Sequence, residues 1–161
     1  MHAPVRAYVA LGSNLGDPVA SVRAALADLQ GLRATRLVVA SPLYRTAPVG
    51  LLHQPDFING VAALDTELAA VGLLAELFAI EARHGRRRNV RNAPRTLDLD
   101  LLLYGDVCQD DPTLTLPHPR MHERAFVLRP LVDVAPQVVI PGRGPAAALL
   151  AALPAQRVLP L

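Results

Sequence analysis

The chain has 161 residues, of which 52% are apolar, and a formal net charge of +2 at pH 7. A chain of this length and composition can bury a hydrophobic core, so we expect a single domain over residues 1–161. The small net charge excludes a polycation that would bind nucleic acid over its whole surface.

The first predicted elements are a strand and a helix joined by a glycine loop. Val5–Leu11 is a short apolar run typical of a strand. Asp17 has the position of a helix N-cap, and Pro18 that of the first helical residue. Apolar residues then recur at helical spacing, which predicts a helix over Pro18–Gln30. Asn14, in the glycine loop, is either a substrate contact or part of a plain turn.

The middle of the chain continues with strands and one long helix. The predicted elements are strands at Leu37–Ala40, which can run on through Tyr44–Thr46, and at Phe57–Leu64, a helix at Leu68–His84, a basic loop at Arg86–Pro94 and a strand at Leu97–Tyr104. The order strand, helix, strand, strand, helix, strand is that of the ferredoxin-like βαββαβ sandwich, an α+β fold. Two helices would cover one face of a mainly antiparallel sheet, and the other face would need further cover or a ligand.

A proline-rich tail from Asp106 onward offers only short elements. The pattern predicts a helical turn near Met121–Leu128 and a helix near Pro145–Leu153. The ferredoxin-like core would therefore carry C-terminal additions.

The apolar runs and the cysteine content bear on the compartment. The N-terminal apolar run is too short for a signal peptide, and the longest run near the C-terminus is too short to span a bilayer. The single cysteine, Cys108, excludes an internal disulfide and is typical of a reducing compartment. We therefore expect a cytoplasmic protein with no membrane partner.

Two aspartates lie in the last predicted strand, within the segment APRTLDLDLLLYG. Alternate side chains of a strand share a face. Asp98 and Asp100 should therefore point to one face, and the other face should carry Leu97, Leu99, Leu101 and Leu103. Two carboxylates at neighbouring positions on one strand face repel each other, and a bound divalent cation offsets this repulsion. Mg²⁺ is commonly held by carboxylates together with substrate phosphates. The alternative is an edge strand with a solvated acidic face.

An arginine-rich segment precedes the aspartates. It contains Arg83, Arg86, Arg87, Arg88, Arg91 and Arg95, with no acidic residue between them. The planar guanidinium group suits phosphate oxygens, so this segment beside a carboxylate pair points to polyphosphate chemistry. A solvated run of charge is the alternative.

Three further residues are candidates for substrate contacts. Phe57 and Asn59 fall on one strand face, where an aromatic plate and an amide suit a flat heterocycle, although core packing is the alternative. His118 lies between two prolines that stiffen the backbone, and it could donate to phosphate or be structural. Its spacing to His122 does not support a zinc site. An RNA-binding module and a two-metal nucleotidyl transferase stay open as other classes.

Six segments resemble those of the hydroxymethyldihydropterin pyrophosphokinase family of folate biosynthesis: GSNLGD, SPLYRTAPVG, QPDFINGVAAL, IEARHGRRR, APRTLDLDLLLYG and LTLPHPRMHERAFVLRPL. The resemblance implies the ferredoxin-like fold. It also implies transfer of pyrophosphate from ATP to 6-hydroxymethyl-7,8-dihydropterin, giving the pterin diphosphate and AMP. The implied partners are ATP and the reduced pterin alcohol, without nucleic acid, and we expect a monomer. The chain departs from the family pattern at Ala47 and at Asn92–Ala93.

The resemblance also implies roles for individual residues. Asp98 and Asp100 would hold two Mg²⁺ ions between the pterin and the ATP phosphates. The implied catalytic residues are Arg86, Arg95, Asp98 and Asp100; the implied pterin contacts are Thr46, Pro48, Phe57, Asn59 and Phe126; the implied ATP contacts are Glu81, Arg88, Leu101, Thr115, His118 and Arg124.

Overall fold

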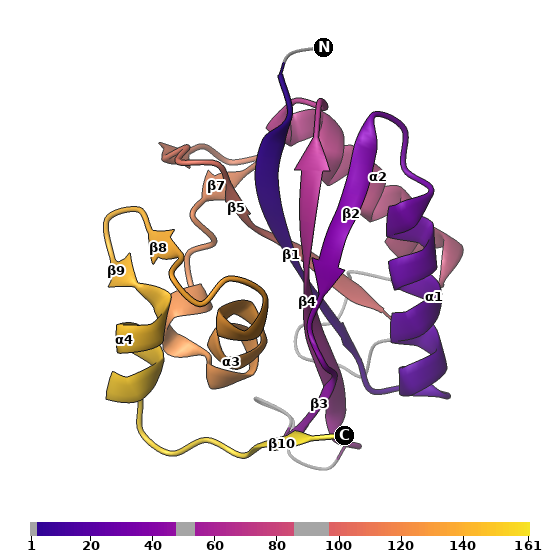
Figure 1. Cartoon of the computed structure of the whole chain (residues 1–161). Coiled ribbons are helices and arrows are strands. Elements are labelled where there is room, and N and C mark those ends of the chain that lie inside the picture. The colour runs from indigo at the N-terminus through magenta and orange to yellow at the C-terminus, as the bar shows by residue number, and fades with distance from the viewer. Residues whose placement is uncertain (1–2, 48–53, 86–96) are drawn as a thin grey trace.

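A six-stranded antiparallel sheet forms the centre of the computed structural model, which describes residues 3–47, 54–85 and 97–161 (Figure 1). The strand order is β10-β3-β4-β1-β5, and β2 also pairs with β4. The strands are β1 (Val5–Ser13), β2 (Thr35–Ala40), β3 (Tyr44–Thr46), β4 (Phe57–Thr66), β5 (Asp98–Tyr104) and β10 (Val158–Pro160).

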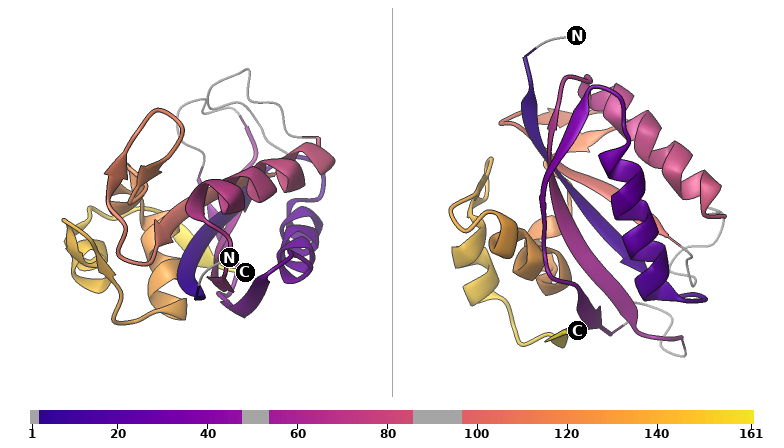
Figure 2. Two further views of the ribbon diagram at one scale, coloured as in Figure 1. Left: turned by 90° about the horizontal axis from the view of Figure 1, so that it is seen from above. Right: turned by 45° about the vertical axis from the view of Figure 1, so that its right-hand side comes forward.

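Helices cover both faces of this sheet. α1 (Pro18–Gln30) connects β1 to β2, and α2 (Ala70–Arg83) connects β4 to β5. Both lie on one face, while α3 (Ala125–Val134) and α4 (Ala146–Ala152) lie on the other (Figures 1 and 2). The two strand–helix–strand units and the antiparallel pairing confirm the predicted ferredoxin-like fold. No helix within the described ranges combines the length and the apolarity that a membrane crossing requires.

The boundaries of α1 follow from the local sequence. The Asp17 carboxylate accepts a hydrogen bond from the Ala20 backbone N–H at 3.1 Å, which satisfies one of the free donors at the helix start. Pro18 has no backbone N–H, and at the first helical position this donor would have no partner within the helix. The observed helix therefore has the bounds that the sequence predicts, and it ends before Gly31.

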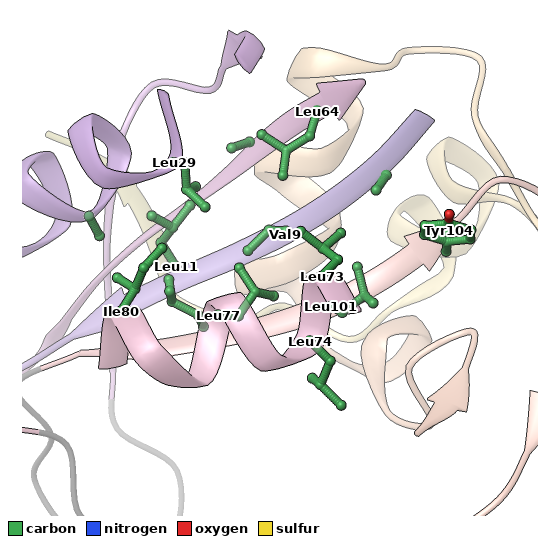
Figure 3. Close-up of a cluster of buried hydrophobic side chains, with 14 of the residues drawn as sticks. Val9, Leu11, Leu29, Leu64, Leu73, Leu74, Leu77, Ile80, Leu101 and Tyr104 are labelled. Carbon is green, nitrogen blue, oxygen red and sulfur yellow. The ribbon is translucent and has the colours of Figure 1, made fainter. Parts of the chain in front are cut away.

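The first hydrophobic cluster lies between the sheet and the helices α1 and α2. Figure 3 shows Leu29 of α1 and Leu77 and Ile80 of α2 around Leu11 of β1, and all four side chains are buried. Alternate residues of β1, Ala7, Val9 and Leu11, belong to this cluster. Burial of these apolar surfaces is the main force that holds the two helices on the sheet.

The strand β5 departs from the regular alternation that the sequence suggests. The register with β1 shifts between the pairs Val9–Leu101 and Tyr8–Leu103, so that Leu102 is an extra residue. Leu99 and Leu101 join the first cluster. Leu102 and Leu103 instead belong to a second hydrophobic cluster, which lies on the opposite face, between the sheet and α3. The prediction that Leu103 shares a face with Leu99 and Leu101 was therefore wrong, because a bulge reverses the alternation.

The tail contains more helix than the sequence suggests. A short helical turn, η1 (Met121–Glu123), precedes α3, which continues to Val134 with Pro130 in its interior. The tail also forms two small hairpins, β6 (Gln109–Asp110) with β7 (Thr115–Leu116) and β8 (Val139–Ile140) with β9 (Gly144–Pro145). Proline usually interrupts a helix, but Pro130 is buried between Leu128 and Leu131, and this packing maintains the helix.

Candidate active site

A cavity of about 340 Å³ opens between the sheet and α3. Neighbouring antiparallel strands bring the ends of β1 and β3 beside the beginnings of β4 and β5, so residues far apart in sequence meet at one end of the sheet. This cavity is called the first cavity below. The residues that line it are Ala10, Leu11, Gly12, Thr46, Ala47, Phe57, Asn59, Asp98, Asp100, Arg120, Arg124, Phe126 and Val127.

A buried polar pair forms one wall of the first cavity. The Thr46 hydroxyl donates a hydrogen bond to Asn59 Oδ1 at 2.5 Å, and both residues are buried. This bond fixes the amide plane, so the Asn59 amide group is oriented beside the cavity. Gly12 pairs with Asn59 in the sheet, and a Cβ atom at Gly12 would lie 2.9 Å from Asn59 Nδ2. The glycine therefore makes room for the amide.

Two aromatic rings line the same cavity from different layers of the fold. Phe57 comes from β4, and Phe126 comes from the first turn of α3. The Arg124 guanidinium carbon lies 5.6 Å from the centre of the Phe126 ring, which is within cation–π range. The cavity therefore combines two flat apolar surfaces with an amide and a cation.

The two aspartates share one face of β5, as predicted, because both line the first cavity. The residue between them, Leu99, points to the opposite face and is buried in the first cluster. Glu81, buried on α2, accepts a hydrogen bond from the Leu99 backbone N–H at 2.7 Å through its carboxylate. α2 therefore holds the backbone between the two aspartates in place.

The carboxylate oxygens of Asp98 and Asp100 are suitable ligands for a hard divalent cation such as Mg²⁺. Among the described residues, no group of three or more acidic, histidine or cysteine side chains could enclose a metal ion. A cation at this pair would therefore need further ligands from a substrate or from water, which is the usual arrangement for Mg²⁺ with phosphates.

A second cavity, of about 240 Å³, lies beside β5 next to α2 and β7. It is lined by Leu74, Phe78, Leu99, Asp100, Leu101, Thr113, Leu114, Thr115, His118 and Pro119. Asp100 belongs to the lining of both cavities. Asp100 is therefore the residue that borders both cavities.

His118 has a fixed orientation at the second cavity. Its backbone N–H donates to the Leu102 carbonyl at 2.9 Å, and its Nδ1 accepts from the Arg120 backbone N–H at 3.2 Å. Burial, and then the charge of Arg124, lowers the pKa of His118 to about 4. The ring is therefore neutral at pH 7, and because Nδ1 is an acceptor, its proton is on Nε2.

Asn14 has a definite position in the loop after β1. It is buried, and its side-chain amide donates to Gln54 Oε1 at 2.7 Å and to the Pro55 carbonyl at 3.0 Å. These bonds hold the segment that leads into Phe57. Asn14 therefore supports the wall of the first cavity from behind.

The structure brings most of the predicted site residues together. Thr46, Phe57, Asn59, Asp98, Asp100, Arg124 and Phe126 line the first cavity, and Asp100, Leu101, Thr115 and His118 line the second. Glu81 lies in neither lining. The predicted residues Pro48, Arg86, Arg88 and Arg95 lie outside the described residues.

Sequence reasoning missed several residues of these linings, among them Gly12, Arg120 and Phe78. Gly12 follows an apolar strand run. An isolated glycine in a strand often marks a place where a ligand or another part of the chain approaches the backbone closely, so this residue could have been predicted. Arg120 is a cation at the first cavity, and Phe78 is an exposed aromatic residue of α2 at the second. Neither of these two has a distinctive sequence pattern.

Comparison with known proteins shows the family of the chain. The family model described as 7,8-dihydro-6-hydroxymethylpterin-pyrophosphokinase (HPPK) matches residues 8–136. A 2-amino-4-hydroxy-6-hydroxymethyldihydropteridine pyrophosphokinase of Pseudomonas aeruginosa is 53% identical over 149 residues, covering 92% of each chain. The enzyme of the same name from Haemophilus influenzae is 47% identical over 137 residues, covering 85% of this chain and 86% of its own.

Solved structures support the fold. A crystal structure described as HPPK-DHPS in complex with substrates has a TM-score of 0.72 at 10% identity and covers 94% of this chain. Wild-type HPPK-DHPS of Plasmodium falciparum has a TM-score of 0.68 at 13% identity and covers 91%. This chain spans 43% of the length of each of these two longer chains. The family match and the close relatives together show that the chain belongs to the 7,8-dihydro-6-hydroxymethylpterin-pyrophosphokinase family.

Proposed function

We propose that this chain, as one domain, transfers the pyrophosphoryl group of ATP to 6-hydroxymethyl-7,8-dihydropterin, giving the pterin diphosphate and AMP for folate biosynthesis. The relatives that cover most of the chain are named for this pyrophosphokinase reaction. The observation that carries the proposal is that Asp100 lies between two cavities, one suited to a flat heterocycle and the other to a nucleotide.

The first cavity has the chemistry that a pterin ring needs. Phe57 and Phe126 provide flat surfaces for stacking, and the buried Thr46–Asn59 pair provides fixed polar groups for the ring edge. The binding cost is low where such groups are already held in position. We assign the pterin to this cavity, with Pro48 as a further contact predicted from the sequence.

The second cavity is the proposed site of the nucleotide. Leu101 and the apolar residues around it suit a base, while Thr115 and His118 offer hydrogen-bond donors. Neutral His118 would donate from Nε2 to a phosphate or ribose oxygen. Arg124, at the first cavity, would contact the phosphates near the carboxylate that borders both cavities. Glu81 and Arg88 complete the ATP contacts that the sequence predicts.

Asp98 and Asp100 are the proposed ligands of two Mg²⁺ ions. The two carboxylates offer the oxygen ligands that Mg²⁺ prefers. ATP would supply further oxygen ligands from its phosphates, because the described residues contain no group of three or more acidic, histidine or cysteine side chains that could hold the ion. When bound, Mg²⁺ supplies charge neutralisation at the phosphates and aligns the two reactants.

The proposed reaction is an in-line transfer. The hydroxymethyl oxygen forms a bond to the β-phosphorus of ATP as the bond from that phosphorus to the α–β bridging oxygen breaks, so AMP leaves. The hydroxyl proton passes to an aspartate carboxylate or to solvent. Arg86, Arg88 and Arg95 are the proposed cations that stabilise the phosphate oxygens. Such reactions gain mostly from positioning and electrostatics.

Product analysis tests this proposal. The protein is incubated with ATP, Mg²⁺ and the pterin alcohol, and the nucleotide products are separated by chromatography. Formation of AMP and pterin diphosphate in equal amounts is the expected result. ADP as the product would contradict it, as would pyrophosphate release with AMP attached to the acceptor, which is the signature of a nucleotidyl transferase. Absence of turnover would also contradict it.

A further inference from the structure

The C-terminal segment contacts three separate walls of the first cavity. We call residues 156–161 the C-terminal strap. It follows α4 and returns to the sheet, where β10 lies beside β3 (Figure 1). Three consecutive strap residues, Gln156, Arg157 and Val158, each hold a different segment that carries a cavity residue.

The first contact holds the segment around Arg124 and Phe126. Gln156 Oε1 accepts a hydrogen bond from the Ala125 backbone N–H at 2.9 Å, and its Nε2 donates to the Glu123 carbonyl at 3.3 Å. The two bonds lie on either side of Arg124 and at the start of α3. The side-chain amide of Gln156 therefore caps α3 where this helix contributes Phe126 to the cavity.

The second contact holds the start of β4. Arg157 Nη2 donates to the Asp56 carboxylate at 2.5 Å, and Asp56 directly precedes Phe57. Because Gln156 and Arg157 are adjacent, the two aromatic walls of the cavity are fixed relative to each other through two neighbouring side chains. These walls come from β4 and α3, and Phe57 and Phe126 are 69 residues apart in sequence.

The third contact holds β3. Val158 pairs with Thr46 and Pro160 with Tyr44, and the Leu161 backbone N–H donates to the Leu43 carbonyl at 3.1 Å. Thr46 is the residue that orients the Asn59 amide. The strap therefore holds both the aromatic walls and the polar wall.

We infer that the C-terminal strap is a positioning element that sets the spacing of Phe57 and Phe126 for the pterin ring, with Gln156 and Arg157 as positioning residues. The inference rests on the proposed function. The Arg157 side chain is 55% exposed and that of Asp56 27%, and exposed ion pairs contribute little to stability. The contact therefore serves to position the cavity walls more than to stabilise the fold, since misplaced walls weaken ligand binding without unfolding the chain.

A separate set of hydrogen bonds joins β3 to α3 and should keep the fold intact when the strap is altered. The Tyr44 hydroxyl hydrogen-bonds to Asp133, and Arg129 donates to Asp133 at 3.1 Å, so α3 stays joined to β3. These residues lie away from the cavity lining. Substitutions in the strap should therefore loosen the cavity walls while the sheet and α3 remain assembled.

The test compares steady-state kinetics of the wild type with those of Arg157→Ala and of the double variant Gln156→Ala/Arg157→Ala. The single change should raise the KM for the pterin up to about fivefold, and the double change roughly tenfold. The KM for ATP should rise less than that for the pterin, because Gln156 also holds the backbone on either side of Arg124. The melting temperature should stay close to that of the wild type. Arg157→Lys should recover much of the pterin affinity, because it keeps the charge.

The matched control is Arg33→Ala, which breaks the exposed Arg33–Glu76 ion pair of 3.4 Å away from both cavities. It should leave both KM values unchanged. Unchanged pterin KM in the double variant would overturn the inference. So would equal rises for both substrates together with a lower melting temperature, which is the sign of a structural role.

Hydrogen exchange separates this inference from the proposed function. The double variant should show faster amide exchange at residues 123–126 and at 56–57 than the wild type, whether or not the reaction is the one proposed. Unchanged exchange at both segments would contradict the strap alone. A wild-type protein that forms no AMP would contradict the proposed function alone.

Discussion

Leu99 donates its backbone N–H to the buried Glu81 carboxylate at 2.7 Å, at the position between Asp98 and Asp100. A helix on one face of the sheet thus fixes a strand whose acidic side chains point to the other face. The precision of the carboxylate pair therefore depends on a residue that lies in neither cavity lining.

This relationship predicts the effect of removing the Glu81 carboxylate. Glu81→Ala leaves the Leu99 N–H without this partner in a buried place, so the free energy of unfolding should fall by ~1–3 kcal/mol. Glu81→Gln keeps an acceptor oxygen and should lose less. Urea unfolding followed by circular dichroism measures both variants. Equal losses in the two variants would contradict the role of this hydrogen bond.

Loss of either aspartate should affect the reaction far more than the fold. Asp98→Ala and Asp100→Ala should each raise the activation barrier by several kcal/mol, since each removes a proposed ligand of the charge-neutralising cations. Stability should be maintained, because removal of one carboxylate relieves the repulsion from the other. The AMP assay gives the rates. Asp106→Ala, an exposed acid just after the same strand, is the control and should retain full activity.

A side chain at Gly12 should disturb the pterin contact. The Cβ of Gly12→Ala would lie 2.9 Å from Asn59 Nδ2, so the amide must move. The KM for the pterin should rise by about tenfold, the cost of a misplaced hydrogen-bonding group, while that for ATP changes little. Gly31→Ala meets only ordinary contacts of 3.6 Å or more and serves as the control. An unchanged pterin KM in the Gly12 variant would argue against Asn59 as a ring contact.

His118 should make the protein less stable in mild acid. Its pKa is about 4 in the folded protein against a usual 6.5, so the unfolded chain binds the proton more readily between these values. The contribution of neutral His118 to the free energy of unfolding is therefore fully present above pH 6.5 and is lost as the pH falls toward 4. At pH 5 the loss should reach up to ~2 kcal/mol.

The measurement is urea unfolding at pH 7.5 and pH 5 for the wild type and for His118→Gln. The variant lacks the titrating ring, so its stability should fall less between the two pH values. Parallel losses in the two proteins would show that other groups control the acid sensitivity.

The sequence predicted the elements whose signals are local. α1 has the predicted bounds because Asp17, Pro18 and Gly31 mark its ends through short-range chemistry. The shared face of Asp98 and Asp100 followed from the two-residue repeat of a strand. These inferences needed no knowledge of distant partners.

Features that depend on distant partners could not be predicted in this way. The extra residue Leu102 is defined only by the register with β1, and the extension of α3 past Pro130 depends on tertiary packing. The bonds of Gln156 and Arg157 join the tail to segments 31 and 101 residues away. No local pattern carries that information.

The bulge at Leu102 divides β5 into two parts with separate duties. Before it, the strand turns Asp98 and Asp100 toward the first cavity; after it, the same face carries Leu103, which packs in the hydrophobic cluster between the sheet and α3. Substitution of Asp98 or Asp100 should therefore change the cavity without loosening the packing of the sheet against α3. One surplus residue thus separates the part of a short strand that borders the cavity from the part that joins the packing between the sheet and α3.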